Sequence, residues 1–209
     1  CRFWTSQNDK SLTNTFRYPP YGPGMLWESC ATQYQKMGGI LLKNTAVSFC
    51  EYDHENKIWR IQLTHANGEI TPVTCHHLIS SAPIKQLVCD FLSPRPPESC
   101  LHAAQQLRYR DFLIVVLILR EKNLLTDNWI YIHDKTVDVG RIQNFKSWSP
   151  NMVPDDTLCS YGLEYFCNEG DILWSMNDAQ LIKKASDEII TIGLAAQNDI
   201  LDGCVVRQL

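Results

Sequence analysis

Hydrophobic residues recur along the chain at two periods, one typical of helices and one typical of strands. Apolar side chains spaced three to four residues apart predict a helix over 24–37, which the pair Gly38-Gly39 would end. The same spacing predicts a long helix over 177–193 with Asn177 as its N-cap. Two shorter helices are predicted over 84–91 and 98–107.

Strands are predicted where polar and apolar residues alternate, or where short apolar runs lie between turn residues. In 57–63, Trp59, Ile61 and Leu63 alternate with more polar positions, which is typical of a half-buried strand. Asn67-Gly68 is a strong hairpin signal, so the first strands are expected to form an antiparallel meander. The predicted strands cover 40–42, 46–52, 57–63, 69–74 and 77–82, then 112–119, 128–134, 139–148, 158–167 and the final "GCVVRQ". The fold class is therefore α+β, with a mainly antiparallel sheet and flanking helices.

Composition and charge exclude several classes of partner. The chain has 209 residues, a formal net charge of -4 and no Lys/Arg-rich run, so a nucleic-acid partner is not expected. The longest apolar run, 112–119, has eight residues, whereas a membrane helix needs ~20. The expected partner is a small-molecule substrate.

The cysteines and histidines predict neither disulfides nor a metal site. Nine cysteines are scattered singly, with no CxxC pair, which is typical of reduced, buried thiols in a cytoplasmic protein. His76-His77 has no neighbouring ligands at zinc-site spacing. The chain begins at Cys1 and stops inside a predicted strand, so we expect an internal piece of a longer protein.

Local catalytic motifs give no function, but the order of elements does. GxSxG, the P-loop, HExxH and GxGxxG do not occur. The order "YPPYGPGM", helix, "GG", "ILLKNTAVSFCEYD", hairpin, "HHLISSAP" resembles the central part of the FAD-dependent amine oxidase and protoporphyrinogen oxidase superfamily, and "LRYRDFLIVVLIL" continues the match. The segments "RIQNFKSWSP" and "GLEYFCNEGDILWSM" are similar to bacterial FAD/NAD(P)-dependent oxidoreductases, some of them like UDP-galactopyranose mutase.

The resemblance implies a two-domain flavoprotein with FAD as its cofactor in the intact chain. The Rossmann motif GxGxxG would precede Cys1, and a flavin-contacting segment would follow Leu209. The implied segments are 1–35, a substrate-domain segment with a connecting loop and helix; 36–83, strands of the FAD domain; 84–202, the substrate-binding domain; and 203–209, the start of the return to the FAD domain.

The resemblance also implies cofactor-binding residues. Val47 would present its backbone N–H and C=O to the adenine of FAD, from an extended position at a sheet edge. Ser80, Ala82 and Pro83 would close a strand against the adenosine-pyrophosphate part, because small residues allow close approach of backbone to ligand. The alternative for both segments is an ordinary strand that ends in a turn.

Candidate substrate-binding residues come from the opening loop and from the later strands. Arg17 and Tyr18 would face the active-site cavity, or else serve only as a surface cation and a packing residue. Gly22 and Gly24 of the same loop favour positive φ or tight packing over anion binding. The strand candidates, which could equally be sheet core, are Tyr131, Arg141, Asn144, Lys146, Trp148 and Tyr165. Alternation places Arg141, Gln143 and Phe145 on one face and Ile142, Asn144 and Lys146 on the other, and either face could line the cavity.

The function implied is hydride transfer from a small organic substrate to flavin. Many amine oxidases carry a lysine on the strand that corresponds to 112–119, and this chain does not, which disfavours amine oxidation proper. One alternative is a mutase-like flavoenzyme acting on a sugar nucleotide, with a diphosphate clamp drawn from Arg17, Arg108, Arg110 and Arg141. Others are a cofactor-free scaffold of the same fold, or an independent α+β domain. The chain alone is expected to be inactive, to bind FAD weakly and to expose apolar patches.

Overall fold

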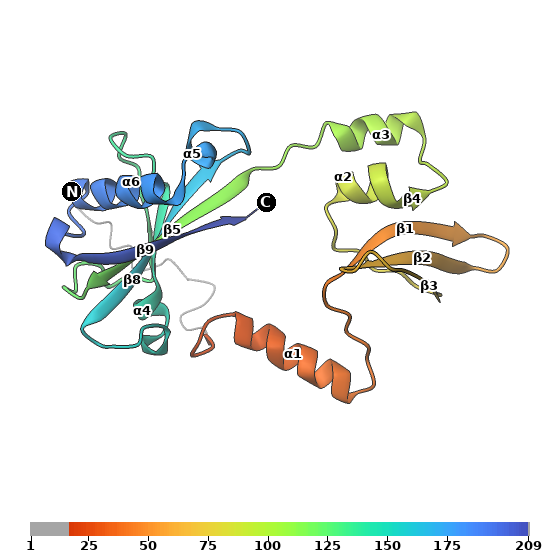
Figure 1. Ribbon diagram of the computed structural model, residues 1–209, viewed down its shortest axis with the longest axis horizontal. Coiled ribbons are helices and arrows are strands. Elements are labelled where there is room, and N and C mark those ends of the chain that lie inside the picture. The colour runs from red at the N-terminus through yellow and green to blue at the C-terminus, as the bar shows by residue number, and fades with distance from the viewer. Residues whose placement is uncertain (1–16, 209) are drawn as a thin grey trace, which may run out of the picture. The chain divides into compact units, whose positions relative to one another are not determined.

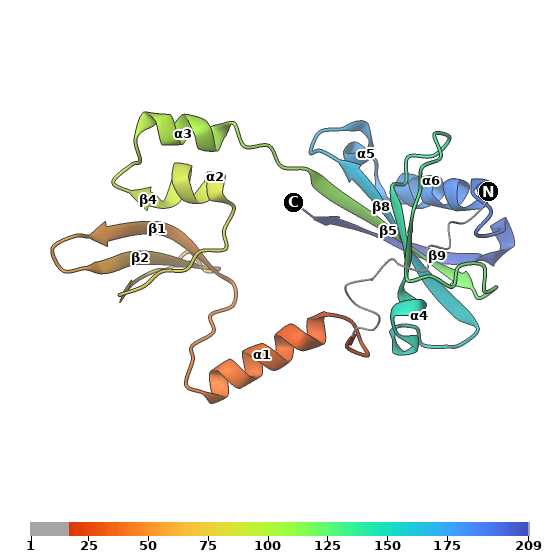
Figure 2. The ribbon, with the colours of Figure 1, turned by 180° about the vertical axis from the view of Figure 1, so that it is seen from behind.

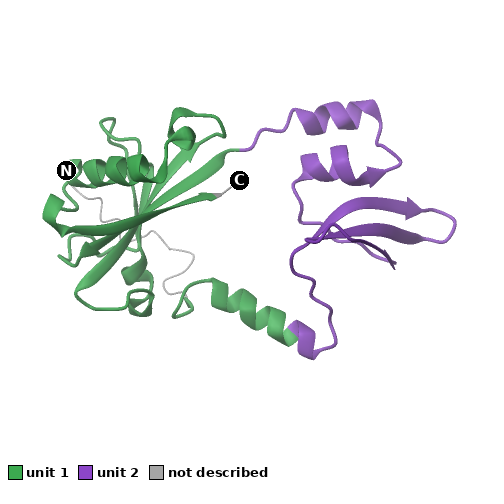
Figure 3. Cartoon of the chain, in the orientation of Figure 1, with its two compact units in different colours: residues 1–33, 110–209 green, residues 34–109 purple. Residues whose placement is uncertain are grey.

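The computed structural model describes residues 17–208 and divides them into two compact units (Figure 3). Unit 2 comprises residues 34–109, and unit 1 comprises the remaining described residues. Residues 84–109, assigned by the resemblance to the substrate domain, therefore lie in the same unit as the meander. Residues 1–16 and Leu209, parts of the first and last implied segments, lie outside the described residues.

The opening loop leads into helix α1 (Gly24–Lys36) through a tight turn. Gly22 has φ +94°, which explains the glycine there, and its N–H donates to the Pro19 carbonyl at 3.0 Å. The helix begins at Gly24, as predicted, and Gly38 at φ +90° follows its end. None of its residues is buried.

Unit 2 contains a four-stranded sheet in the order β3-β2-β1-β4. Strands β1 (Thr45–Asp53), β2 (Ile58–His65) and β3 (Ile70–Cys75) form the predicted antiparallel meander, and β4 (Leu92–Ser93) pairs in parallel with β1. The β2–β3 turn contains Asn67-Gly68, and Gly68 has φ +83°. The hairpin prediction is therefore confirmed.

Two predicted strands of unit 2 are wrong. Residues 40–42 and 77–82 are irregular, because neither segment has a neighbouring strand with which to pair. The helical prediction for 84–91 is confirmed as α2 (Ile84–Gln86) running into the π-helical turn η1 (Leu87–Phe91). The helix predicted over 98–107 is α3 (Glu98–Gln105).

Unit 1 is built on a five-stranded antiparallel sheet in the order β6-β7-β8-β5-β9 (Figure 1). Its strands are β5 (Asp111–Arg120), β6 (Trp129–Tyr131), β7 (Arg141–Asn144), β8 (Leu158–Cys167) and β9 (Ile200–Gln208). Strands β5 and β8 pair along their whole length. The final strand, part of the implied return to another domain, is an edge strand of this sheet.

Helix α6 (Asp178–Thr191) covers one face of the unit 1 sheet, as the two opposite views show (Figures 1 and 2). Asn177 is its N-cap, as predicted, and forms a capping box with Gln180. The short elements of unit 1 are α4 (Phe145–Trp148), η2 (Pro150–Met152), α5 (Ile172–Ser175) and η3 (Gln197–Asp199). No helix in 17–208 has the length and apolarity needed to cross a membrane.

The core of unit 1 lies between its sheet and α6. Alternate residues of β5 and β8 point toward the helix and form one cluster with it. The fully buried members include Leu113, Val115, Leu117, Leu163, Tyr165, Ala185 and Ile189. The opposite face of the sheet has no helix of this length over it among the described elements, and we call it the open face. The α+β prediction is confirmed.

Candidate functional site

Unit 2 contains a cavity of about 390 Å³ that brings together three of the four predicted cofactor-binding residues. Val47, Ser80 and Ala82 all line it. The remaining lining residues come from β1, the irregular segment before α2, and the α2–η1 turn: Ala46, Cys50, Leu78, Ile79, Ser81, Gln86, Leu87 and Phe91. Because no lysine, arginine or carboxylate is among them, the cavity suits an uncharged group.

Val47 lies in an irregular, partly open stretch of β1. The register between β1 and β2 shifts between Val47 and Phe49, which marks a bulge. Strand β4 pairs with β1 only at Cys50 and Glu51, so the start of β1 has β2 as its only strand neighbour among the described strands. The backbone of β1 is therefore accessible from one side beside the cavity.

The segment Ser80–Pro83 is a turn that leads into a helix. The Ser80 hydroxyl accepts a hydrogen bond from the Ala82 backbone N–H at 3.3 Å. Pro83 does not line the cavity but caps α2, and its carbonyl accepts from the Leu87 N–H at 3.0 Å. Burial raises the pKa of the Cys50 thiol on the cavity wall.

In unit 1, the candidate residues divide between the two faces of the sheet. Ile142 is part of the core, so alternation puts Arg141 and Gln143 on the open face. The strand register aligns them in rows with residues of the other strands. One row is Trp129, Gln143, Gly162, Val116 and Cys204, and the next is Tyr131, Arg141, Glu164, Ile114 and Val206.

Glu164 forms the polar centre of the open face. Its side chain is 0 % exposed, and its two carboxylate oxygens accept hydrogen bonds from Arg141 Nε and Gln143 Nε2. The ion pair raises the pKa of Arg141, and Tyr131 adds to the effect. Arg141 lies over the Tyr131 ring, with its Cζ 5.8 Å from the ring centroid.

Two glycines explain how a carboxylate on the open face becomes buried. A Cβ on Gly162 would lie 2.9 Å from the Phe145 ring, and one on Gly140 would lie 2.8 Å from the Phe166 ring. Each glycine thus lets an aromatic ring lie directly on the sheet beside Glu164. The rings exclude water, which strengthens the pair with Arg141 and makes an unpaired Glu164 costly.

An aromatic stack stands next to this ion pair. Trp129 stacks on Trp148 with ring centroids 5.2 Å apart, and Tyr18 stacks on the same tryptophan at 4.9 Å. The Tyr18 hydroxyl lies 3.7 Å from the Met152 sulfur, and burial raises the pKa of this hydroxyl. A cavity of about 210 Å³ is lined by Trp129, Arg141, Gln143 and Trp148. Arg17, the other loop candidate, is exposed.

Tyr165 does not join this group, because it lies on the opposite face of β8. It is fully buried under α6, and its hydroxyl donates to Glu188 Oε2 at 2.9 Å. Burial, together with the nearby Glu188 carboxylate, raises the pKa of the Tyr165 hydroxyl. This geometry makes Tyr165 a core residue.

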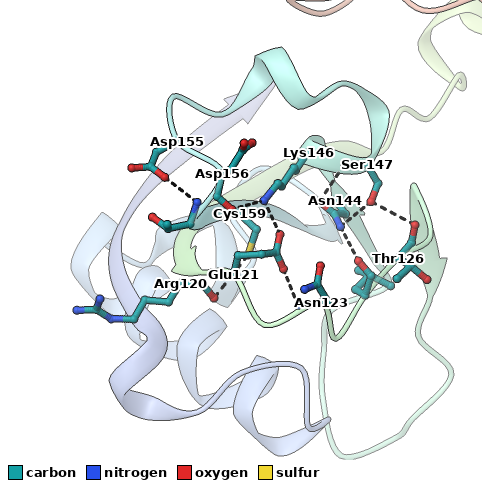
Figure 4. Close-up of polar contacts among 12 residues, drawn as sticks. Arg120, Glu121, Asn123, Thr126, Asn144, Lys146, Ser147, Asp155, Asp156 and Cys159 are labelled. Atoms are coloured by element: carbon teal, nitrogen blue, oxygen red, sulfur yellow. Dashed lines mark hydrogen bonds and ion pairs between the residues drawn. The ribbon is translucent and has the colours of Figure 1, made fainter.

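Asn144 and Lys146 lie in a separate polar cluster (Figure 4). Strand β7 ends at Asn144, whose side chain accepts from the Ser147 N–H and caps α4, so the predicted strand to 148 and the alternation through Phe145 and Lys146 are wrong. Lys146 Nζ lies 3.1 Å from Glu121 Oε2 and donates to the Asp156 carbonyl at 2.6 Å.

The surroundings of this cluster satisfy its polar groups. Burial alone would raise the pKa of Glu121, but the Asn123 backbone N–H and Lys146 lower it. Asn144, which is buried, donates to the Leu125 carbonyl at 2.6 Å. Both candidates thus have well-defined structural partners.

The sequence analysis missed Glu164 and Trp129 and gave Gln143 no role. A carboxylate inside the otherwise apolar run "YGLEYF" was the available signal, since a buried charge requires a partner.

Comparisons with known proteins find solved structures with a similar fold, all at low sequence identity. No family model matches the chain, and no curated protein matches it. Among solved structures, reduced UDP-galactopyranose mutase matches with TM-score 0.72 and 18 % identity, over 91 % of this chain and 39 % of the mutase. A putative protoporphyrinogen oxidase from Exiguobacterium sp. matches with TM-score 0.59 and 14 % identity, over 86 % of this chain and 38 % of the oxidase.

A putrescine oxidase with redesigned cofactor binding also matches, with TM-score 0.63 and 9 % identity, over 88 % of this chain and 38 % of the oxidase. The chain thus spans less than half the length of each of these proteins. At these identities the likeness establishes the fold alone: the chain shares the fold of the matching part of the mutase and the two oxidases.

Proposed function

We propose that this chain forms the central part of an FAD-dependent oxidoreductase that takes hydride from a small organic substrate. The observation that carries the proposal is the 390 Å³ cavity of unit 2, which gathers Val47, Ser80 and Ala82 in a fold shared with two oxidases. The open face of the unit 1 sheet supplies the substrate-binding surface.

The unit 2 cavity fits the adenine end of FAD. Leu78, Leu87 and Phe91 provide apolar contact for a planar base, and the backbone of β1 beside Val47 provides hydrogen-bonding groups. Since no cation lines the cavity, the pyrophosphate of FAD would be held by other parts of the intact protein. When bound, the flavin supplies the hydride acceptor, and the protein binds and orients the substrate.

A pair of matched variants tests the cofactor site. Ala82→Leu fills the cavity, so the protein that contains this chain should lose FAD during purification. Ala66→Leu places the same side chain on the exposed β2–β3 turn of the same unit and should retain FAD. Equal FAD content in both variants, measured by absorbance of the released cofactor, would count against the site.

The reaction class is tested by anaerobic mixing with panels of small amines and alcohols. In the proposed step, a substrate C–H bond breaks and its hydrogen passes with both bonding electrons, as hydride, to the bound cofactor, while the substrate N–H or O–H proton passes to solvent and a C=N or C=O bond forms. Bleaching of the flavin absorbance by one panel member identifies the substrate class. If FAD is bound and no panel member bleaches it, the redox proposal fails.

A second candidate is non-redox chemistry on a sugar nucleotide, favoured by the likeness to UDP-galactopyranose mutase over 91 % of this chain. Of its four arginine candidates, Arg141 is already paired with Glu164, which weakens it as a diphosphate donor. Arg17, Arg108 and Arg110 remain. Conversion of UDP-galactopyranose by the reduced enzyme, and its loss on Arg→Met substitution of these three, would support this candidate over substrate oxidation.

A further inference from the structure

The 210 Å³ cavity on the open face has an unusual combination of walls. Trp129 and Trp148 supply stacked aromatic rings, and Arg141 and Gln143 supply polar groups. Trp129 is 42 % exposed, so a ligand can reach its ring. Because Trp129 is held by Trp148, and Trp148 by Tyr18, the aromatic wall is preorganised.

The hydrogen bonds to Glu164 fix which polar atoms face a ligand. Arg141 uses its Nε on Glu164 and also hydrogen-bonds the Tyr131 side chain, which leaves the other N–H groups of its two terminal nitrogens. Gln143 uses its amide nitrogen on the same carboxylate, which leaves its carbonyl oxygen Oε1 as an acceptor. Arg141 and Gln143 are consecutive on the open face, so donors and an acceptor lie side by side.

The charge of the site disfavours an ionised ligand. Glu164 balances the charge of Arg141, and the pair lies between two phenylalanine rings. A carboxylate that reached Arg141 would lose its hydration beside the charge of Glu164, and an ammonium group would meet the guanidinium. An uncharged group with a carbonyl beside an N–H satisfies both residues without that cost.

The geometry points to a subsite that binds an aromatic primary amide, or an equivalent planar ring with C=O beside N–H, with Glu164 as the residue that positions its two polar contacts. The ring packs against Trp129, its carbonyl accepts from Arg141 and its N–H donates to Gln143 Oε1. This inference rests on the proposed function, since it names the recognised part of the substrate bound on that face.

Four small probes that share a benzene ring test the inference by isothermal titration and ligand-observed NMR on the full chain. Benzamide keeps both groups, N,N-dimethylbenzamide lacks the donor, benzoate is an isosteric anion and benzylamine is a cation. Benzamide should bind about tenfold more tightly than each of the other three, the effect of one lost hydrogen bond or one unfavourable charge. Tighter binding of benzoate or benzylamine, or no binding of benzamide, would overturn the inference.

Variants locate the binding. Trp129→Ala and the milder Trp129→Leu should each weaken benzamide binding about tenfold, because both remove the ring face. Val206→Ala lies on the same face at the far edge strand and should leave binding unchanged. Equal losses in the tryptophan and valine variants would overturn the location. The titration needs no flavin, so its failure is distinguishable from that of the oxidoreductase proposal, which the cofactor measurements decide.

Discussion

The two units of the chain differ sharply in how much apolar surface they bury. Unit 1 has a cluster of fifteen buried hydrophobic residues between its sheet and α6. Within its residues 34–109, unit 2 buries four, Cys50, Ile61, Leu101 and Ala104. Both units expose large apolar side chains, for example Ile79 and Ile84 in unit 2 and Trp27 and Ile172 in unit 1. The difference therefore lies in the internal core: unit 2 buries less apolar surface than unit 1 to stabilise its fold.

The difference has a structural origin. In unit 1, β5 and β8 pair over ten residues each, and every second side chain enters the core. In unit 2, the apolar residues of 40–42 and 77–82 lie in irregular segments beside the sheet. The second of these segments lines the proposed adenine cavity. A part of unit 2 that no strand pairing holds in place is therefore the part assigned to the cofactor.

The largest effect is expected from a truncation in the core of unit 1. Leu163 is 0 % exposed, so Leu163→Ala should lower the free energy of unfolding of unit 1 by roughly 3–5 kcal/mol. Ile70→Ala, on an exposed side chain of unit 2, should change stability by less than about 0.5 kcal/mol. Urea denaturation of both variants measures this contrast, and a small effect at Leu163 would refute it.

A somewhat smaller loss is expected from Arg141→Met, which leaves the buried Glu164 without its charged partner. The expected cost is about 3 kcal/mol, the low end for a broken buried pair, because the Arg141 side chain is 30 % exposed. The double variant Arg141→Met/Glu164→Leu removes the unpaired charge and should recover much of the stability. If the double variant is no more stable than the single one in denaturation, Glu164 is not held by this pair.

The labelling rates of two buried cysteines, one in each unit, compare how easily the two units open. Cys50 is in unit 2 and Cys159 in unit 1, where burial raises the Cys159 pKa to about 11. Both thiols should react through local opening, and the smaller core of unit 2 should open more easily, so Cys50 should label at least about tenfold faster. Iodoacetamide labelling followed by mass spectrometry measures the rates, with exposed Cys204 as the fast control. Faster labelling of Cys159 would reverse the proposed order of stability.

The smallest effect is expected at the N-cap of α6, the helix that closes the core of unit 1. Asn177→Ala removes the capping box and should cost about 1 kcal/mol. Asn177→Asp keeps a side-chain acceptor and should remain close to the native stability. A thermal-unfolding comparison that finds Asn177→Ala as stable as the native chain would show that the cap does not contribute to stability.

The parts of the fold that the sequence predicts well are those with local signals. Strand β8 follows from alternation along its own ten residues, and the start of α6 follows from Asn177. Strand predictions at 40–42 and 77–82 were wrong because a strand also needs a neighbour, which those sequences do not encode locally. The alternation across Asn144 failed because that side chain caps a helix instead of continuing the strand.

In the candidate site, too, residues with a local signal were predicted and residues that depend on distant contacts were missed. The resemblance placed Val47, Ser80 and Ala82 in one functional group, and the structure brings them to one cavity. Glu164 escaped notice because its burial depends on Gly140 and Gly162, whose missing side chains make room for rings from elsewhere in the fold. The packing of these rings beside Glu164 depends on the register of the sheet strands, which residue types alone do not specify.

Whether the cavity of unit 2 holds part of FAD is tested by the visible absorption spectrum of the purified protein that contains this chain. If FAD binds there, the protein should show a flavin spectrum, and denaturation should release FAD, identified by mass spectrometry. The 209-residue chain by itself should not reach sub-micromolar affinity for FAD in a titration. A protein that is colourless as purified, and remains so after addition of FAD, would rule out this cofactor site and favour a cofactor-free scaffold of the same fold.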